Sequence, residues 1–233
     1  MSIPHRYLIV VAGGKGVRMG SDIPKQFLLL AGRPLIFHTI GRFIDYDPGM
    51  EIIIVLPAGT ESLWKELCNK YDFTQGHHII SGGSERFNSV RNGLSLVRQE
   101  SLVAVHDAVR PLVSHGTIDR CFTMAARKGN AVPFTRPSES VRETLSDKAS
   151  QPISRDTIAL VQTPQVFRSD ILLAAFAQPY SPSFTDDASV VEAAGNRINL
   201  VEGNRENIKI TTAEDLLVAE SFFDHMGGRR EEG

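Results

Sequence analysis

The stretch YLIVVAGGKGVRMG, residues 7–20, decides the fold class of this chain. Its first five residues are apolar and rich in Val and Ile, as in a strand buried on both faces of a sheet. The glycines that follow let the backbone come close to a ligand and direct N–H groups at phosphates. The segment predicts a buried strand that ends in a phosphate-binding loop.

The loop departs from two well-known nucleotide-binding motifs. Met19 stands where the dinucleotide fingerprint G-x-G-x-x-G/A needs its third glycine, and the P-loop pattern G-x-x-x-x-G-K-[ST] is absent. What remains is a glycine loop with several cations, among them Arg18 and, in the following PKQF segment, Lys25. Such a loop suits a triphosphate, and a glycine turn with solvated Arg and Lys is the alternative.

Outside this stretch, short apolar runs alternate with helical patterns along the chain. The further strands are expected at residues 52–56, 78–80, 102–105, 131–134 and 158–161, and the helices from Pro34, Glu61, Glu85, Ser114, Arg168, Asp186 and Thr212. Alternation of this kind implies right-handed crossovers and a mostly parallel, doubly wound α/β sheet.

Residues 135–156 interrupt the alternation. They are polar, lack a helical stripe and contain the alternating piece VRETL at 141–145, followed by SDK at 146–148. This pattern predicts a β-hairpin arm that projects from the core. We expect one domain over residues 1–226 with this arm, and a frayed tail at 227–233.

Composition limits the partners. The 233 residues are 42% hydrophobic and 22% charged, and the formal net charge is −2. Without a basic field, long nucleic acid is not an expected partner, and phosphate binding must come from a few placed cations. Cys68 and Cys121 lie apart and read as reduced thiols. No apolar run approaches a membrane span or a signal peptide, so a cytoplasmic protein with no membrane association is expected.

A second segment, LVAVHDAVRP at 102–111, ends a buried strand in Asp107. Open α/β sheets bind ligands at that edge, and Mg2+ prefers one or two carboxylates together with phosphate oxygens. Asp107 is therefore a candidate magnesium ligand. The alternative is an Asp107–Arg110 pair that stabilises a turn. His106 is expected to be a hydrogen-bonded structural group rather than a base.

Other polar positions are less decisive on spacing alone. GGSERFNS at 82–89 reads as a loop feeding a helix, with Ser84 as an expected N-cap, which a base-recognition role of the loop does not exclude. Asp186 and Asp187 suit a helix N-terminus. Lys209 stands in a polar segment and is an ordinary exposed lysine on spacing alone.

Taken together, eight features in order resemble one family, the methylerythritol 4-phosphate cytidylyltransferases of the non-mevalonate isoprenoid pathway. They are AGGKGVRM, PKQF, GGSERFNSV, HDAVRP, the arm, QTPQVF, TDDASVVE and GNRENIKIT. Each is weak alone, but eight in this order are specific, and they extend over nearly the whole chain.

The resemblance implies a Rossmann-like nucleotidyltransferase fold and a homodimer interlocked through the arms. It also implies roles for particular residues. CTP would be bound by Ala12, Gly13, Gly14, Gly16, Gly83, Ser84 and Ser89, with Ser89 reading cytosine; catalytic cations would be Arg18, Lys25 and Lys209; the metal would lie beside Asp107; the alcohol phosphate would be held by Arg110, Thr185 and, from the partner's arm, Ser140 and Arg155.

Three positions depart from the family pattern. Ser84 stands where many relatives have aspartate, so backbone atoms are expected to contact cytosine there. Ser140 replaces a frequent threonine and keeps the hydroxyl. Glu206 stands where aspartate is common, and a metal role for Glu206 or Asp186 is left open.

The expected reaction transfers CMP from CTP to 2-C-methyl-D-erythritol 4-phosphate with Mg2+, and pyrophosphate leaves. A ribitol 5-phosphate cytidylyltransferase is the nearest alternative, because its relatives share AGGKG, PKQF and HDAVRP. A non-catalytic nucleotide-binding module and a nicotinamide dehydrogenase are more distant alternatives.

Overall fold

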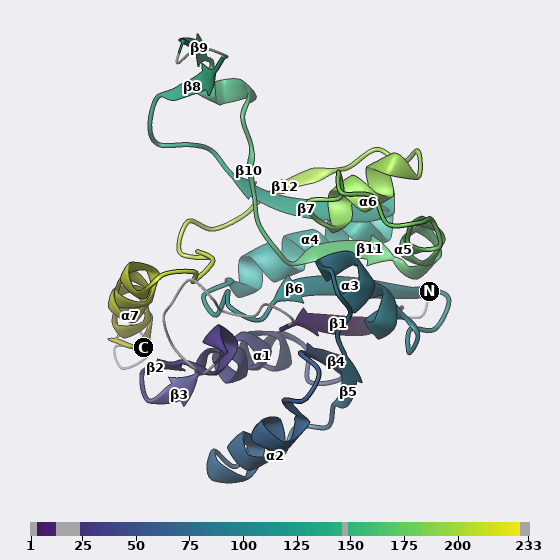
Figure 1. The fold of residues 1–233 in the computed structure, drawn as a ribbon, viewed down its shortest axis with the longest axis vertical. Coiled ribbons are helices and arrows are strands. Elements are labelled where there is room, and N and C mark those ends of the chain that lie inside the picture. The colour runs from purple at the N-terminus through teal and green to yellow at the C-terminus, as the bar shows by residue number, and fades with distance from the viewer. Residues whose placement is uncertain (1–3, 13–23, 146–148, 229–233) are drawn as a thin grey trace.

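A computed structural model gives the structure of the chain and describes residues 4–12, 24–145 and 149–228 (Figure 1). Its strands are β1 (His5–Val11), β2 (Leu29–Leu30), β3 (Arg33–Pro34), β4 (Glu51–Leu56), β5 (His78–Ser81), β6 (Ser101–Asp107), β7 (Asn130–Thr135), β8 (Val141–Thr144), β9 (Ser150–Ile153), β10 (Leu160–Val161), β11 (Gln165–Arg168) and β12 (Leu200–Glu202). Its α-helices are α1 (Leu35–Tyr46), α2 (Glu61–Lys70), α3 (Arg86–Leu94), α4 (His115–Lys128), α5 (Ser169–Phe176), α6 (Asp187–Ala193) and α7 (Ala213–Gly228).

The central sheet has the strand order β10-β7-β11-β6-β1-β4-β5, and β12 also pairs with β7. β1 lies between β4 and β6 and is parallel to both, with Val11 opposite Val55 on one side and Asp107 on the other. β11 is antiparallel to both of its neighbours, β6 and β7. The α/β fold with a mostly parallel sheet, expected from the sequence, is confirmed.

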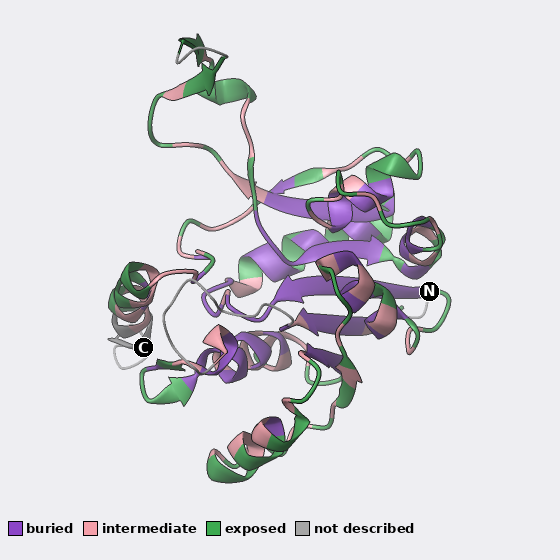
Figure 2. Ribbon diagram, viewed as in Figure 1, coloured by how far each residue is buried: buried purple, intermediate pink, exposed green. Residues whose placement is uncertain are grey.

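Helices cover both faces of this sheet, and the side chains of each strand alternate between them. Leu8 and Val10 of β1 point into a cluster with α1 and α4, whereas Tyr7 and Ile9 point into a second cluster with α3, α5 and α6. This period of two explains why β1 is apolar at every position from Tyr7 to Val11. Figure 2 shows the buried strands enclosed between the helices.

Every strand and helix start expected from the sequence has its counterpart, with shifts of one or two residues at the ends. β11, β12 and the small β2–β3 ladder were not expected. β11 carries a polar residue at each end of a four-residue strand, and β12 has three residues, so neither gives a readable apolar pattern. Long buried strands were readable because both of their faces are apolar.

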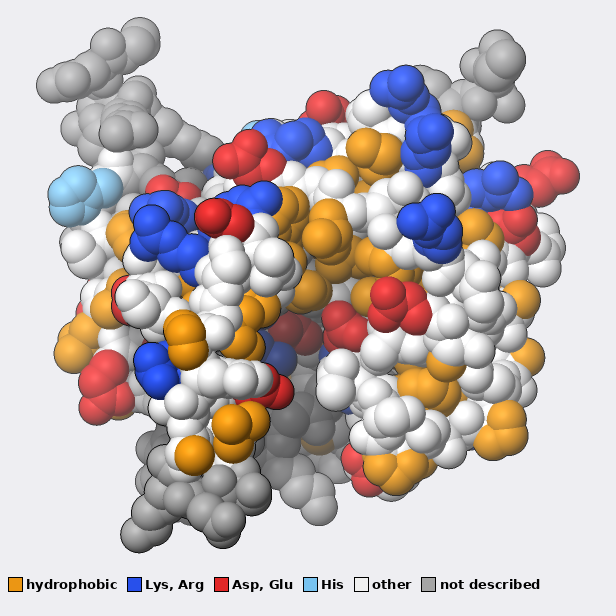
Figure 3. All heavy atoms as spheres, turned by 90° about the horizontal axis from the view of Figure 1, so that it is seen from above, with side chains coloured by type: hydrophobic (Ala, Val, Ile, Leu, Met, Phe, Trp, Pro, Cys, Tyr) orange, Lys and Arg blue, Asp and Glu red, His pale blue; other side chains and the backbone are white. Residues whose placement is uncertain are grey.

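The segment expected to form an arm contains an antiparallel hairpin of β8 and β9, with Val141 opposite Ile153 and Thr144 opposite Ser150. The hairpin projects away from the central sheet (Figure 1). On the face seen from this end, the described Lys and Arg side chains are interspersed with Asp and Glu (Figure 3). α7 continues to Gly228, and residues 229–233 of the expected frayed tail lie outside the described part.

None of the helices in the described residues is both long enough and apolar enough to span a membrane.

Candidate active site

The site lies where three parallel strands end side by side. Ala12 follows β1 and donates its N–H to Val55 O of β4 at 2.9 Å, while Ala108 after β6 donates to Val11 O at 3.1 Å. Gly82 after β5 donates to Leu56 O at 2.7 Å. Ala12 and the first residues after β5 and β6 therefore lie at the carboxyl edge of the sheet, where open α/β folds bind ligands.

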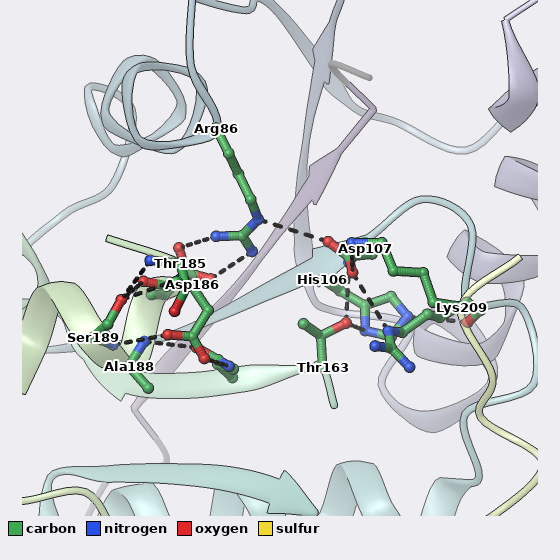
Figure 4. A network of polar contacts seen from close by, with 12 residues as sticks. Arg86, His106, Asp107, Thr163, Thr185, Asp186, Ala188, Ser189 and Lys209 are labelled. Carbon is green, nitrogen blue, oxygen red and sulfur yellow. Dashed lines mark hydrogen bonds and ion pairs between the residues drawn. The ribbon is translucent and has the colours of Figure 1, made fainter. Parts of the chain in front are cut away.

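Asp107, the last residue of β6, is 7% exposed and is surrounded by three cations. Its Oδ2 lies 3.0 Å from Lys209 Nζ and 3.4 Å from Arg110 Nε, and its Oδ1 lies 3.7 Å from Arg86 Nε. Burial by itself would raise the pKa of Asp107, but Arg86, Lys209 and Arg110 hold that pKa well below its ordinary value. The side chain is therefore a carboxylate at physiological pH. Figure 4 shows its contacts with Arg86 and Lys209.

His106 belongs to a closed chain of internal hydrogen bonds. The Thr163 hydroxyl accepts from the Asp107 N–H at 3.1 Å and meets His106 Nδ1 at 3.0 Å, and His106 Nε2 lies 3.1 Å from Arg110 O. Because a carbonyl only accepts, Nε2 carries the proton and Nδ1 accepts from Thr163. Burial lowers the pKa of His106 to about 4. The expected structural role of His106 is confirmed, and so is the Asp107–Arg110 contact.

A first cleft, with a volume of about 200 Å3, opens beside Asp107. It is lined by Asp107, the predicted metal ligand, and by all the described residues that the sequence assigned to the nucleotide and to catalysis: Ala12, Lys25, Gly83, Ser84, Ser89 and Lys209. Gly13, Gly14, Gly16 and Arg18 lie outside the described residues.

The loop between β5 and α3 forms one wall of this cleft and is held by Ser89. The Ser89 hydroxyl accepts from the Gly83 N–H at 3.1 Å and donates to Glu85 O at 3.1 Å. A Cβ on Gly83 would lie 2.3 Å from Asn88 Cβ, so this position needs glycine. Ser84 as an N-cap was wrong, because α3 starts after Glu85, which makes no side-chain cap.

A second cleft, also of about 200 Å3, adjoins the first. It contains Arg110 and Thr185, both assigned from the sequence to the alcohol phosphate, together with Gln162, Thr163, Gln165 and Asp186. Three charged residues line both clefts: Arg86, Asp107 and Lys209. The structure thus brings two predicted groups of residues into neighbouring clefts that share one carboxylate and two cations.

The start of α6 shapes the second cleft. Asp186 accepts from the Ser189 N–H at 2.9 Å and completes a capping box, and its other oxygen accepts from Gln165 Nε2 at 2.7 Å. The expected place of Asp186 and Asp187 at a helix start is confirmed. Both Asp186 oxygens are thus engaged by the fold.

Two predicted residues do not join the clefts within this chain. Ser140 directly precedes β8, and Arg155 begins a short 3-10 helix after β9. Arg155 Nη1 donates to Ser138 O at 3.1 Å rather than to a carboxylate. Glu206 is also outside both clefts, and its carboxylate accepts from Asn204 Nδ2 at 3.1 Å.

The sequence analysis assigned no role to Arg86 or to Asn207, which lies two residues before Lys209. Arg86 stands inside the GGSERFNSV motif, so its charge within a glycine loop was the available signal. Asn207, which is fully buried, donates to Thr163 O at 2.8 Å, and its own carbonyl accepts from Arg110 Nη1 at 2.7 Å. These contacts join segments more than 40 residues apart, which no local pattern reveals.

The sheet is doubly wound, and at its carboxyl edge a cleft contains a glycine loop and a carboxylate surrounded by cations. These features are typical of an α/β nucleotide-binding transferase. The family model for IspD, 2-C-methyl-D-erythritol 4-phosphate cytidylyltransferase, matches residues 7–225. This chain belongs to that family of enzymes.

Relatives and solved structures agree with this membership. The 2-C-methyl-D-erythritol 4-phosphate cytidylyltransferase of Phocaeicola vulgatus is 50% identical over 216 residues, which are 93% of this chain and 98% of that protein. That of Alkaliphilus oremlandii is 40% identical over 229 residues, covering 95% and 96%. The crystal structure of the Thermus thermophilus enzyme aligns with a TM-score of 0.76 at 31% identity, over 94% of this chain and 98% of that one.

Proposed function

We propose that this protein transfers CMP from CTP to 2-C-methyl-D-erythritol 4-phosphate and releases pyrophosphate. The observation that carries the proposal is the pair of adjoining clefts, which share Asp107, Lys209 and Arg86. One cleft holds the residues assigned to the nucleotide and the other holds those assigned to the alcohol phosphate. A transfer between two phosphate-bearing molecules needs this arrangement of neighbouring sites with cations at their junction.

The proposed step is a single in-line displacement at the α-phosphorus of CTP. An oxygen of the methylerythritol phosphate forms the new P–O bond, and the bond from the α-phosphorus to the oxygen that bridges it to the β-phosphorus breaks. Pyrophosphate leaves with the electron pair of that bond. Because the attacking phosphate oxygen is already ionised, the step needs no general base, which agrees with the internal, neutral state of His106.

We propose that the site accelerates the transfer by positioning the two substrates and by neutralising the charge of their phosphates. Lys25 and Lys209 line the first cleft, and Arg110 lines the second. Fixed cations at a site where negative charge develops lower the barrier more than mobile solvent does. We assign Lys25, Lys209 and Arg18 to the phosphates of CTP, and Arg110 and Thr185 to the acceptor.

The donor set fits a magnesium ion that is shared with substrate phosphates. Asp107 is the carboxylate that lines both clefts, and the described residues contain no cluster of three or more His, Cys, Asp or Glu side chains able to hold a metal. Mg2+ accepts one carboxylate with phosphate oxygens and water as its remaining ligands. When bound beside Asp107, it would neutralise charge on the nucleotide phosphates.

Base recognition is proposed for the loop of residues 82–89. Cytosine differs from uracil in offering an N4–H2 donor, so discrimination needs a placed acceptor. Gly83 and Ser84 of the loop line the first cleft, and the Ser89 hydroxyl accepts from the Gly83 N–H.

The hairpin arm is proposed to complete the site of a partner subunit in a cytoplasmic homodimer. Ser140 and Arg155 flank the β8–β9 hairpin, which projects away from the sheet, and neither lines a cleft of its own chain. An isologous two-fold axis would make each arm serve the other chain.

Pyrophosphate release tests the proposal. The purified protein is incubated with CTP and Mg2+ and with methylerythritol 4-phosphate, with ribitol 5-phosphate or with neither acceptor. Release that requires both substrates supports the transfer. No release under any condition supports a non-catalytic nucleotide-binding module, and release with ribitol 5-phosphate alone supports the ribitol enzyme.

A further inference from the structure

Arg86, whose side chain is 28% exposed, and Asp187 form a bidentate ion pair between the first residues of α3 and α6. Arg86 Nη1 donates to Asp187 Oδ1 at 2.8 Å, and Nη2 donates to Oδ2 at 2.7 Å. The Asp187 side chain has no exposed surface. Figure 4 shows the Arg86 guanidinium with a contact toward Asp107 as well. The pair links two elements that are 101 positions apart in the sequence.

The guanidinium faces both clefts. Arg86 lines the first cleft and the second, and its Nε lies 3.7 Å from Asp107 Oδ1. Burial alone would lower the pKa of Arg86, but the Asp187 carboxylate raises it above its ordinary value. The Lys209 side chain is 43% exposed and that of Arg86 is 28% exposed. Arg86 is therefore the less exposed of these two cations, and a second carboxylate, that of Asp187, holds it through two hydrogen bonds.

Packing around the pair keeps the two helix starts together. Phe87, next to Arg86, stacks on Phe176 of α5 at 4.9 Å between ring centroids and on Phe184 at 5.6 Å. Phe184 directly precedes Thr185, which lines the second cleft. The nucleotide side and the acceptor side of the site thus share one aromatic cluster as well as one ion pair.

Stability alone does not account for this pair. Buried ion pairs cost desolvation, and apolar side chains of similar volume often replace them without loss. Phe87 and its partners already supply apolar contact between α3 and the segment before α6. What apolar side chains cannot supply is a fixed positive charge at the junction of two clefts.

We propose that Asp187 is a positioning residue that fixes the Arg86 guanidinium between the two clefts, so that Arg86 meets phosphate oxygens where the two substrates adjoin. The identity of these phosphates rests on the proposed function. Asp187 touches neither substrate in this account and acts only through Arg86.

A double-mutant cycle tests this dependence. The proteins are wild type, Arg86→Gln, Asp187→Asn and the double variant, with Asp170→Asn as the matched control because Asp170 pairs with Arg168 on the surface. Loss of one preorganised cation predicts roughly a 100-fold lower kcat/KM for Arg86→Gln. We expect Asp187→Asn to cost about 10-fold alone and less than twofold in the Arg86→Gln background. Asp170→Asn should keep full activity.

Thermal unfolding separates positioning from folding. In the double variant, the Gln and Asn amides can hydrogen-bond to each other, so its unfolding midpoint should return toward that of wild type while kcat/KM stays low. Equal losses from Asp187→Asn in both backgrounds would overturn the proposal. So would a double variant that recovers activity together with stability. If Arg86→Gln does not fold, Arg86→Lys, which keeps the charge and loses the bidentate fork, takes its place in the cycle.

A binding measurement keeps this inference separate from the proposed function. If wild type releases no pyrophosphate, the proposed reaction fails, and calorimetric titration of the same proteins with CTP and Mg2+ decides the inference. The inference is supported if Asp187→Asn lowers the affinity for CTP in the wild-type background but not in the Arg86→Gln background. Additive losses of affinity, or no loss in either single variant, would overturn it.

Discussion

Lys209 reaches the carboxylate of Asp107 from a segment 102 positions later in the chain, and its Nζ lies 3.0 Å from Oδ2. The Lys209 side chain is 43% exposed whereas that of Asp107 is 10% exposed, so the contact spans the boundary between the interior and the clefts. The backbone holds Lys209 here, because its neighbour Ile210 donates its N–H to Val109 O at 3.0 Å.

Lys209 and Lys25 both line the first cleft, and this position predicts the effect of removing either positive charge. Lys209→Ala and Lys25→Ala should each lower turnover by roughly 100- to 1,000-fold, since each removes a fixed positive charge beside developing phosphate charge. Lys128→Ala, at the exposed end of α4, is the control and should be neutral. Steady-state pyrophosphate release measures all three. A loss of less than fivefold at saturating substrate, for either cleft lysine, would remove it from the catalytic set.

Gly83 tests the base loop. The added methyl of Gly83→Ala would meet Asn88 Cβ at 2.3 Å and Asn88 C at 3.2 Å, so the loop or the start of α3 must shift. We expect at least a 10-fold rise in KM for CTP and a weaker preference for CTP over UTP. Gly76→Ala, which meets no atom within 4 Å, is the matched control and should change neither. An unchanged preference in Gly83→Ala would place base recognition elsewhere.

Ser89→Ala separates the hydroxyl from the backbone of the same loop. It removes the acceptor of the Gly83 N–H, and the loop then loses one support. If the CTP preference survives while KM rises, backbone groups make the distinction. Full retention of both values would show that Ser89 neither reads the base nor positions the loop.

The arm predicts recovery in mixed dimers. Arg155→Ala and Lys25→Ala proteins, each nearly inactive, are mixed and allowed to exchange subunits. If Arg155 serves the partner's cleft, one site of each mixed dimer is intact, and random exchange should restore roughly a quarter of all sites. Tagged subunits verify the exchange. Verified exchange without regained activity would contradict a shared site, and substantial activity of Arg155→Ala alone would give Arg155 a local role.

His106 predicts a pH dependence of stability. The folded state holds the His106 pKa at about 4, against 6.5 for an ordinary histidine, so the unfolded chain binds more protons between these values. The free energy of unfolding should therefore fall as pH drops through this window, by roughly 2 kcal/mol between pH 7 and pH 5 from this group.

Urea unfolding at both pH values measures this contribution. His106→Asn should have a lower stability at pH 7 and a shallower pH slope than wild type. An equal slope in His106→Asn and wild type would contradict the assignment.

The sequence was sufficient for the parts of the fold that depend on local pattern. The long buried strands and the starts of the helices follow from apolar runs, and Asp107 could be placed at the carboxyl edge of β6 for the same reason. β12 has three residues and the antiparallel β11 is inserted between β6 and β7, so both depend on tertiary pairing.

The site divides in the same way. Lys209 was assigned a catalytic role only through the family resemblance, because the residues around it form no pattern that indicates such a role. Its contact with Asp107 forms only in the folded chain. Arg86 was assigned no role, because nothing in the GGSERFNSV motif indicates its distant partner. Its burial against Asp187 arises only when α3 and α6 pack on the same face of the sheet.

The most direct test of the proposed function is a competition between two acceptors. Methylerythritol 4-phosphate and ribitol 5-phosphate are supplied together at equal concentration with limiting CTP and Mg2+, and the cytidine diphosphate products are separated and quantified. The account predicts that cytidine diphosphate methylerythritol is the dominant product and that pyrophosphate forms in equal amount. A dominant ribitol product, or consumption of neither acceptor, would contradict it.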